Sequence, residues 1–174
     1  MKNKAVFLDR DGTINIDYGY VHKSDNFEFI PGVIEALKLL QDLGYKLIII
    51  TNQSGIERGY YTEDDFYKLV AFMKNQLEKH NIYIDDVYFC PHLDSECNCR
   101  KPKLELFYRA ATDHNIDFSM SYTIGDNFRD VAICDEEAVK GIVLSDKAEL
   151  LNSSLISCKD LLDAASYIKR HALS

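Results

Sequence analysis

Residues 7–13 read Phe7-Leu8-Asp9-Arg10-Asp11-Gly12-Thr13, and this short run indicates how the chain folds. The apolar residues Ala5–Leu8 lead into it and are typical of a buried strand. Two carboxylates, Asp9 and Asp11, follow the strand, and Gly12 permits a tight turn. Carboxylates at the end of such a strand can hold a hard cation, supply a nucleophile, or act as acid and base. A pair of aspartates by itself is also common in solvent-exposed turns. Whether this pair belongs to a functional site therefore depends on the segments that follow.

The composition is that of one globular domain. The chain has 174 residues, 47 % hydrophobic and 28 % charged, so we expect a single domain over residues 1–174. A net charge of −8 without a basic stripe disfavours nucleic acid as a partner. The longest aliphatic run, Leu47–Ile50, is too short to span a bilayer, and no signal-peptide pattern is visible. We therefore expect a cytoplasmic monomer with no membrane or nucleic-acid partner.

Strand and helix patterns alternate along the chain. Short apolar runs predict strands over Ala5–Leu8, Lys46–Ile50, Asp86–Phe89, Ser121–Ile124 and Gly141–Leu144. Amphipathic stretches predict helices over Val33–Leu43, Leu104–His114, Arg129–Val139 and Lys159–His171. A further amphipathic helix is expected to begin after Thr62, which is a good N-cap residue. This alternation predicts an α/β fold, a Rossmann-like parallel sheet with helices on both faces. No insert is long enough to form a large cap domain.

Every unusual motif falls in one of four strand-to-helix loops, which a parallel sheet gathers at one edge. The loop 51–61 opens with Thr51-Asn52-Gln53-Ser54, whose hydroxyl, amide and backbone N–H groups suit a phosphate oxygen. Such a string is more often an ordinary polar turn. The loop 125–129 adds Asp126, which with Asp9 and Asp11 makes an oxygen cage of the kind that Mg²⁺ prefers.

The loop 90–103 contains Cys90, His92, Cys97 and Cys99. Three cysteines and one histidine are a structural zinc composition, and a chain without export signals is not expected to form disulfides. Four protein ligands leave no open position for water, so we expect zinc to shape the loop at 90–99 and to take no part in chemistry.

Two cations follow the last of these cysteines. Arg100 and Lys101 would be held by a metal-bound loop at the sheet edge, opposite Asp9 and Asp11. A phosphoryl group fits between such acids and bases, because lysine offers a point charge and arginine a planar fork. At any other place in the sequence, solvent-exposed charge would be the favoured interpretation.

Four motifs together resemble the signature of the haloacid dehalogenase superfamily of phosphatases: Asp9-x-Asp11-Gly12-Thr13, Thr51-Asn52, Lys101, and Gly125-Asp126-x-x-x-Asp130. The likeness runs from residue 5 to about residue 145. The Cys/His loop is similar to that of the branch that contains heptose-bisphosphate and histidinol-phosphate phosphatases. Residues 17–32 and 52–59 are similar to the heptose members, whereas the short Cys/His loop is nearer the histidinol type.

The resemblance implies a Mg²⁺-dependent phosphatase that removes the 7-phosphate of D-glycero-D-manno-heptose 1,7-bisphosphate, in the synthesis of activated heptose for lipopolysaccharide or other surface glycans. It implies Asp9 as the nucleophile that forms an aspartyl-phosphate, and Asp11 as general acid and then base. Thr51 and Lys101 would hold the phosphoryl oxygens. Asp9, the backbone carbonyl of Asp11, and Asp126 would bind Mg²⁺.

The implied small-molecule phosphosugar would be recognised by residues of all four loops. The expected substrate-binding residues are Asp17, Tyr18, Gly19, Tyr20, Asn52, Gln53, Ser54, Arg100 and Asn127. Asn127 stands where the heptose enzymes are expected to have lysine, which removes one cation near the sugar.

Two alternatives to this function are open at the level of sequence. The short Cys/His loop favours a histidinol-phosphate phosphatase. A non-catalytic phosphosugar-binding protein would belong to a different class, and the intact Asp9, Asp11, Lys101 and Asp126 speak against it.

Overall fold

The computed structural model describes residues 1–93, 96–145 and 154–172. Six parallel strands form one sheet in the order β3-β2-β1-β4-β5-β6. The strands are β1 (Ala5–Leu8), β2 (Lys46–Asn52), β3 (Asp86–Cys90), β4 (Tyr122–Gly125), β5 (Lys140–Leu144) and β6 (Ile156–Cys158). The α-helices are α1 (Val33–Asp42), α2 (Glu63–Glu78), α3 (Glu105–Asp113), α4 (Phe128–Val131) and α5 (Leu161–Ala172).

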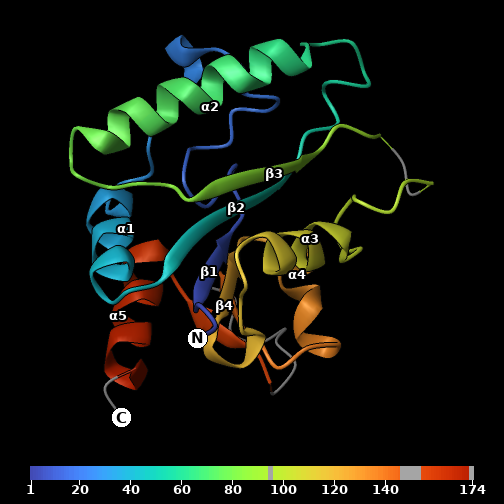
Figure 1. Cartoon of the computed structure of the whole chain (residues 1–174). Helices are drawn as coiled ribbons and strands as arrows, with labels where there is room; N and C mark the ends of the chain where they lie inside the picture. Colours follow the sequence, from blue (N-terminus) through green and yellow to red (C-terminus); the bar gives the residue numbers. More distant parts are fainter. Residues whose placement is uncertain (94–95, 146–153, 173–174) are drawn as a thin grey trace.

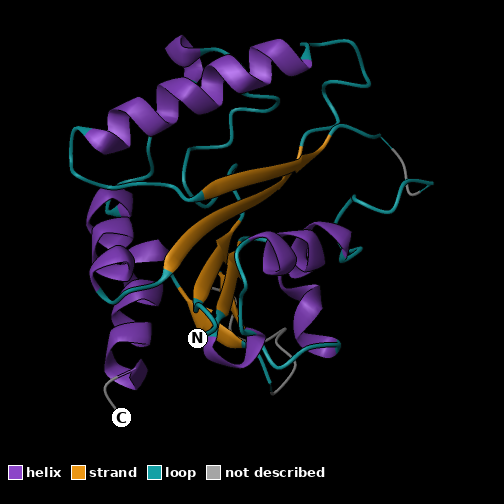
Figure 2. Ribbon diagram, in the orientation of Figure 1, coloured by secondary structure: helices purple, strands orange, loops and turns teal. Residues whose placement is uncertain are grey.

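Both faces of the sheet are covered by helices, as Figures 1 and 2 show. Val6 and Leu8 of β1 point into a core that they share with α1 and α5, which lie side by side. Ala5 and Phe7 point to the opposite face, where the Phe7 ring meets the Phe107 ring of α3 edge to face at 5.4 Å. A strand buried on both faces needs a continuous apolar run, which Ala5–Leu8 supplies. The expectation of helices on both faces is confirmed.

Helix α2 begins where the sequence predicts. The Thr62 hydroxyl accepts a hydrogen bond from the Asp65 amide at 3.1 Å, and the Asp65 carboxylate accepts one from the Thr62 amide at 2.9 Å. This reciprocal capping box satisfies two amides that have no partner within the helix. The helix runs alongside β3 in Figure 1, and its Met73 and Leu77 are buried in the core that it shares with α1 and α5. Among the described residues no large cap domain covers the sheet.

Two elements differ from the expectations. The helix expected over Arg129–Val139 is only the short α4, followed by a 3₁₀ turn at Ala132–Asp135. Val131 and Ile133 are both buried, and residues two apart cannot share one face of an α-helix, so the winding changes between them. Strand β6 was not expected. It has three residues and pairs with β5 at the sheet edge, and a run this short shows no periodicity.

The strand order reverses at β1. The chain continues from β1 to β2 on one side, whereas β4 pairs with the other side of β1. The carboxyl ends of β1 and β4 therefore face a topological switch point, the place where doubly wound sheets bind ligands. Asp9 and Asp126 are the residues that follow these two strands.

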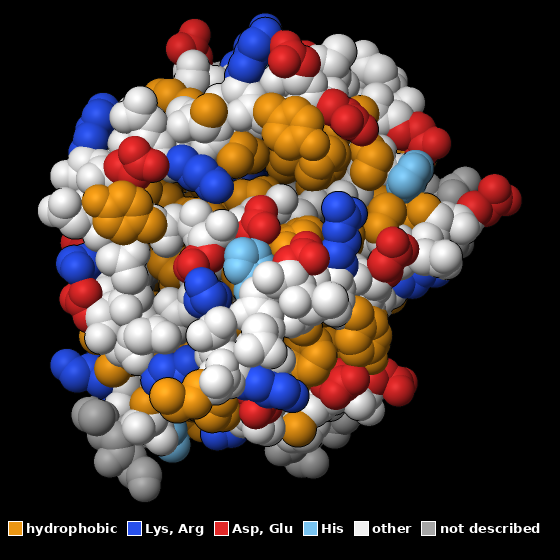
Figure 3. All heavy atoms as spheres, viewed as in Figure 1, with side chains coloured by type: hydrophobic (Ala, Val, Ile, Leu, Met, Phe, Trp, Pro, Cys, Tyr) orange, Lys and Arg blue, Asp and Glu red, His pale blue; other side chains and the backbone are white. Residues whose placement is uncertain are grey.

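None of the helices in the described part of the chain combines the length and the apolar character needed to cross a membrane. On the face drawn in Figure 3, acidic and basic side chains are interspersed among polar and apolar ones.

Candidate active site

Three carboxylates meet at the switch point. Oxygen atoms of Asp9, Asp126 and Asp130 all lie within 4.8 Å of one another. Asp9 and Asp130 are buried and Asp126 is exposed, so the cluster opens to solvent at one side only. Hard oxygen donors in this number suit Mg²⁺, which keeps several waters and takes few carboxylates. The chemistry of the donor set thus fits the expected metal.

A buried lysine lies between two of these carboxylates. Lys101 Nζ is 2.9 Å from Asp9 Oδ1 and 2.7 Å from Asp130 Oδ1, and it donates to the Ile50 carbonyl at 2.6 Å. Burial raises the pKa of Asp9 to about 7, while Lys101 opposes that rise. Burial alone would lower the pKa of Lys101, but the two carboxylates hold it above its ordinary value. Lys101 therefore stays a cation at the base of the site.

Gly12 brings the turn after β1 against Asp126. Its backbone has φ +83°, a left-handed conformation that glycine adopts without strain. A Cβ atom at this position would lie only 2.2 Å from Asp126 Oδ2. The close approach of the two loops at the switch point thus requires glycine here.

The Asp11 side chain is held outside this cluster of carboxylates. Arg10, itself 1 % exposed, donates from one terminal nitrogen to Asp11 Oδ1 at 2.8 Å and to the Val21 carbonyl at 2.7 Å. Asn15 donates to the same carboxylate oxygen at 3.0 Å, and Gln53 donates to Asp11 Oδ2 at 3.1 Å. The carboxylate therefore has a fixed orientation that does not depend on a metal.

Asn52 fixes the backbone of Lys101. Its side-chain amide donates to the Lys101 carbonyl at 3.1 Å and accepts from the Lys101 amide at 3.0 Å. This two-point pairing ties the end of β2 to the loop after β3, from which Lys101 reaches the carboxylates.

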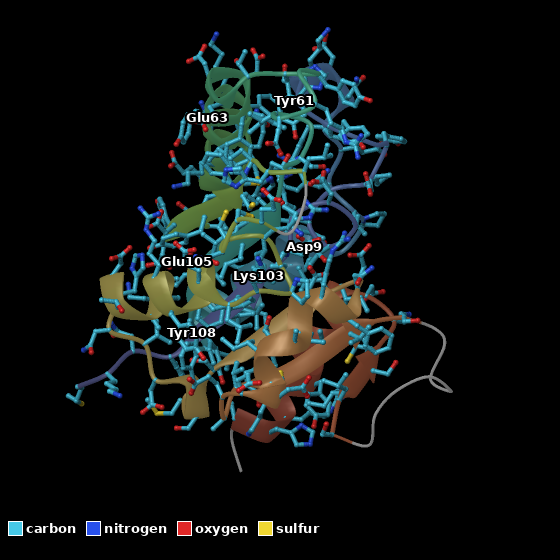
Figure 4. All side chains as sticks on the ribbon, turned by 90° about the vertical axis from the view of Figure 1, so that its right-hand side faces the viewer. Asp9, Tyr61, Glu63, Lys103, Glu105 and Tyr108 are labelled. Carbon is cyan, nitrogen blue, oxygen red and sulfur yellow. The ribbon has the colours of Figure 1, made fainter. Side chains whose placement is uncertain are left out.

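A cavity of about 290 Å³ lies over these groups. Its lining residues are Asp9, Asp11, Asp17, Gly19, Tyr20, Asn52, Gln53, Ser54, Tyr61, Arg100, Asp126 and Arg129. Thr51 and Lys101 are buried, and each is hydrogen-bonded to a lining residue. In Figure 4 Asp9 and Tyr61 lie on the same side of the molecule, Tyr61 on the loop before α2. The structure therefore gathers the four expected loops around one space.

Two of the expected substrate-binding residues do not line this cavity. Tyr18 is 59 % exposed and its hydroxyl donates to the Glu28 carboxylate at 2.6 Å. The Asn127 side chain caps α4 by accepting from the Arg129 amide at 3.2 Å. Arg129 lines the cavity instead of Asn127.

Three residues of the site were missed by the sequence-based expectations. Asp130 belongs to the motif Gly125-Asp126-x-x-x-Asp130, but the sequence alone does not place it near the metal. No motif assigns a role to Tyr61 or Arg129, the last residues of the loops 51–61 and 125–129. The one signal available for Arg129 was its place in the loop 125–129, two residues from Asn127.

The four candidate zinc ligands also come together. Ligand atoms of Cys90, His92, Cys97 and Cys99 lie within 4.8 Å of one another. Cys90 Sγ is 3.4 Å from His92 Nδ1 and 3.6 Å from Cys97 Sγ, and the five cysteines of the chain are free. Such a set of soft donors fits a tetrahedral zinc ion. Arg100, which follows the cluster, donates to the His92 carbonyl at 3.1 Å and is thereby tied to it.

Comparisons with known proteins agree with this geometry. Residues 4–149 match the family described as polynucleotide kinase 3 phosphatase. The chain is 45 % identical over 175 residues to the D-glycero-beta-D-manno-heptose-1,7-bisphosphate 7-phosphatase of Haemophilus ducreyi, a match that covers 90 % of this chain and 96 % of that one. It is 46 % identical over 170 residues to the protein of the same name from Helicobacter pylori J99, covering 96 % and 98 %.

Solved structures show the same fold. The crystal structure of D,D-heptose 1,7-bisphosphate phosphatase from B. bronchiseptica, complexed with magnesium and phosphate, aligns with a TM-score of 0.87 at 25 % identity, covering 97 % of this chain and 99 % of that one. A HAD-superfamily hydrolase from Ehrlichia chaffeensis aligns with a TM-score of 0.64 at 19 % identity, covering 98 % of both chains. The chain therefore belongs to the haloacid dehalogenase superfamily, in the same family as the D-glycero-D-manno-heptose-1,7-bisphosphate 7-phosphatases.

Proposed function

We propose that this protein is a Mg²⁺-dependent phosphatase that removes the 7-phosphate of D-glycero-D-manno-heptose 1,7-bisphosphate. The observation that carries the reaction type is the grouping of Asp9, Asp126, Asp130 and Lys101 beside a cavity at the switch point. The substrate follows from relatives at 45–49 % identity that are named for this activity.

Asp9, Asp126 and the backbone carbonyl of Asp11 would hold the Mg²⁺ ion, with Asp130 beside them. When bound, the ion offsets the repulsion between carboxylate and phosphate and polarises the phosphoryl oxygens. Lys101 contributes a second positive charge at the base of the site, where burial strengthens its interaction with a phosphoryl group.

The chemistry divides between two carboxylates. An oxygen of Asp9 attacks the phosphorus of the 7-phosphate, and the bond between that phosphorus and the oxygen on carbon 7 breaks. Asp11 donates a proton to the leaving alkoxide, so that the sugar departs as an alcohol. Asp11 then accepts a proton from the water that attacks the aspartyl-phosphate, which releases inorganic phosphate and restores the Asp9 carboxylate.

Two arginines would recognise the second phosphate of the substrate. Arg100 and Arg129 both line the cavity, one from the loop after β3 and one from α4. Guanidinium groups bind phosphate through two parallel charge-assisted hydrogen bonds. Asn127 stands where a lysine is expected, and Arg129, two residues later, would supply the positive charge in its place.

The Cys/His cluster would hold a structural zinc ion. Its four donors leave no coordination site for substrate, and the chain continues from Cys99 directly into Arg100 and Lys101. Zinc would therefore fix the loop that carries both cations.

The two alternatives have less support. The relatives at 45–49 % identity bear the heptose name, so a histidinol-phosphate phosphatase is not favoured. A non-catalytic protein is at odds with a complete set of acidic groups and Lys101 at one site.

The direct test compares kcat/KM for heptose 1,7-bisphosphate, as both anomers, with kcat/KM for histidinol phosphate in the presence of Mg²⁺. We expect a large preference for the bisphosphate and no turnover by Asp9→Asn, since an amide is a far poorer nucleophile. A preference for histidinol phosphate would refute the assigned substrate, and an active Asp9→Asn variant would refute the mechanism.

A further inference from the structure

Gln53 is a buried amide whose two ends are both engaged. The residue is 3 % exposed, and its backbone amide donates to the Cys90 carbonyl at 2.7 Å, which fixes the loop after β2. The side-chain nitrogen donates to Asp11 Oδ2 at 3.1 Å and to Thr51 Oγ1 at 2.8 Å. The side-chain oxygen accepts from the Tyr61 hydroxyl at 2.5 Å. Gln53 therefore joins three groups of the site through a single planar amide.

The orientation of this amide follows from its neighbours. The ionised Asp11 carboxylate, the form that later accepts a proton from water, has no hydrogen to donate to the Gln53 oxygen. It therefore favours the orientation that places the Gln53 nitrogen toward Asp11. Tyr61 supports that orientation as a donor to the oxygen. Burial raises the pKa of Tyr61 to about 12, so its hydroxyl keeps its proton at neutral pH.

The Tyr61 ring is held on two sides. It stacks on the His22 ring with centroids 4.8 Å apart and 7° between the planes. On its edge it meets Gly55, where a Cβ atom would lie 2.2 Å from Tyr61 Cε1. The hydroxyl therefore has a fixed position, and the ring contacts do not depend on it.

The amide also directs the Thr51 hydroxyl. Because Thr51 Oγ1 accepts from Gln53, its own hydrogen must be donated elsewhere. The Asn52 carbonyl is 3.5 Å away, at the limit of hydrogen bonding. A phosphoryl oxygen in the cavity would be a better acceptor for the Thr51 hydroxyl.

We propose that Tyr61 and Gln53 are positioning residues of the reaction: the Tyr61 hydroxyl fixes the Gln53 amide, which holds Asp11 and Thr51 in the geometry of phosphoryl transfer. The proposal rests on the proposed function, since that assigns Asp11 to proton transfer and Thr51 to the phosphoryl group. Neither Tyr61 nor Gln53 exchanges a proton or an electron pair with the substrate.

The test uses Tyr61→Phe, which keeps the ring and removes the donor, with Tyr67→Phe as the matched control. Tyr67 lies on α2 and is 55 % exposed, and its ring packs on Phe89 away from the cavity. First-turnover rate constants are measured on two substrates. Heptose 1,7-bisphosphate releases an alkoxide that needs the Asp11 proton, whereas p-nitrophenyl phosphate releases a phenolate that leaves without one.

We expect the first-turnover rate of Tyr61→Phe on the heptose bisphosphate to fall about 10–100-fold, the usual effect of a small misplacement of catalytic groups. The loss on p-nitrophenyl phosphate should be at least about tenfold smaller, because the proton from Asp11 contributes little there. KM should change little, and Tyr67→Phe should behave as the unaltered protein. Misplacement of Thr51 would slow both substrates, so the difference between the two losses reports on Asp11. Equal losses would overturn the role of the Gln53 amide in holding Asp11, and no loss on either substrate would overturn the whole proposal.

Gln53→Glu is the second variant. It keeps an acceptor for Tyr61 but loses both N–H donors and places a carboxylate against Asp11, so we expect a larger loss with the same dependence on substrate. Equal losses on the two substrates would again overturn the role of the amide in holding Asp11, and full activity would overturn the whole proposal. If the unaltered protein does not hydrolyse the heptose bisphosphate, the proposed function fails. The same comparison, made with an alkyl phosphate that it does hydrolyse, then decides the role of Tyr61.

Discussion

Replacement of Gly12 by alanine should damage the metal site through a single methyl group. The new Cβ would lie 2.2 Å from Asp126 Oδ2, about 1.2 Å closer than ordinary van der Waals contact. Either the Asp126 carboxylate turns away or the loop after β1 retreats. Both movements separate Asp126 from Asp9, and the separation should weaken Mg²⁺ binding.

Gly12→Ala also carries a backbone cost that must be separated from this effect. A non-glycine residue in a left-handed conformation costs roughly 1–2 kcal/mol, which lowers the unfolding midpoint by about 2–8 °C in a chain of this length. Gly59→Ala is the matched control. Gly59 has φ +75°, close to the +83° of Gly12, but nothing lies within 4 Å of its added Cβ.

The assay is phosphate release as a function of Mg²⁺ concentration for the unaltered protein and both variants. We expect both alanines to lower the unfolding midpoint similarly. Only Gly12→Ala should raise the Mg²⁺ concentration for half-maximal activity, by roughly 10–100-fold, the effect typical of disturbing the groups that orient metal ligands. If Gly12→Ala and Gly59→Ala need the same Mg²⁺ concentration, the contact with Asp126 does not control the site.

Three further predictions concern the cations and the Cys/His cluster. Lys101→Met leaves two buried carboxylates without their cation and should lower the free energy of unfolding in urea by about 3–5 kcal/mol. Lys68→Met removes a solvent-exposed ion pair and should leave the free energy of unfolding nearly unchanged. Similar losses in the two variants would argue against a buried ion pair. Cys97→Ser should lower the zinc content measured by elemental analysis, because a hydroxyl is a poorer zinc ligand than a thiolate. Cys134→Ser, outside the cluster, should leave the zinc content unchanged. An unchanged zinc content in Cys97→Ser would refute the assignment of Cys97 as a ligand. Arg129→Gln should raise KM for the bisphosphate about tenfold or more, which is the usual effect of losing a charge-assisted hydrogen bond, and leave KM for p-nitrophenyl phosphate unchanged. An equal rise for both substrates would show that Arg129 does not bind the second phosphate.

Much of the fold could be predicted because strand positions and strand ends are local properties. Ala5–Leu8 is a strand with the bounds that its apolar run indicates. Parallel strands bring their carboxyl ends together, so the sequence alone places Asp9 and Asp126 at one edge. The short β6 and the change of winding after Val131 could not be predicted, because both depend on packing against neighbours and not on periodicity.

The direction of each side chain after a strand was harder to infer. Gln53 was expected to contact substrate, and it lines the cavity, but its amide is engaged by Asp11, Thr51 and Tyr61. Asn127 turns to cap α4, so the cation of that loop comes from Arg129. Such choices are set by which buried polar groups need partners, and a linear sequence does not show them.

The measurement that tests the central claim most directly is ³¹P NMR of heptose 1,7-bisphosphate incubated with the protein, with and without Mg²⁺. We predict that the signal of the phosphate at carbon 7 is replaced by inorganic phosphate only when Mg²⁺ is present, while the phosphate at carbon 1 remains. Loss of the carbon 1 phosphate, full activity without a divalent cation, or no reaction at all would contradict the account.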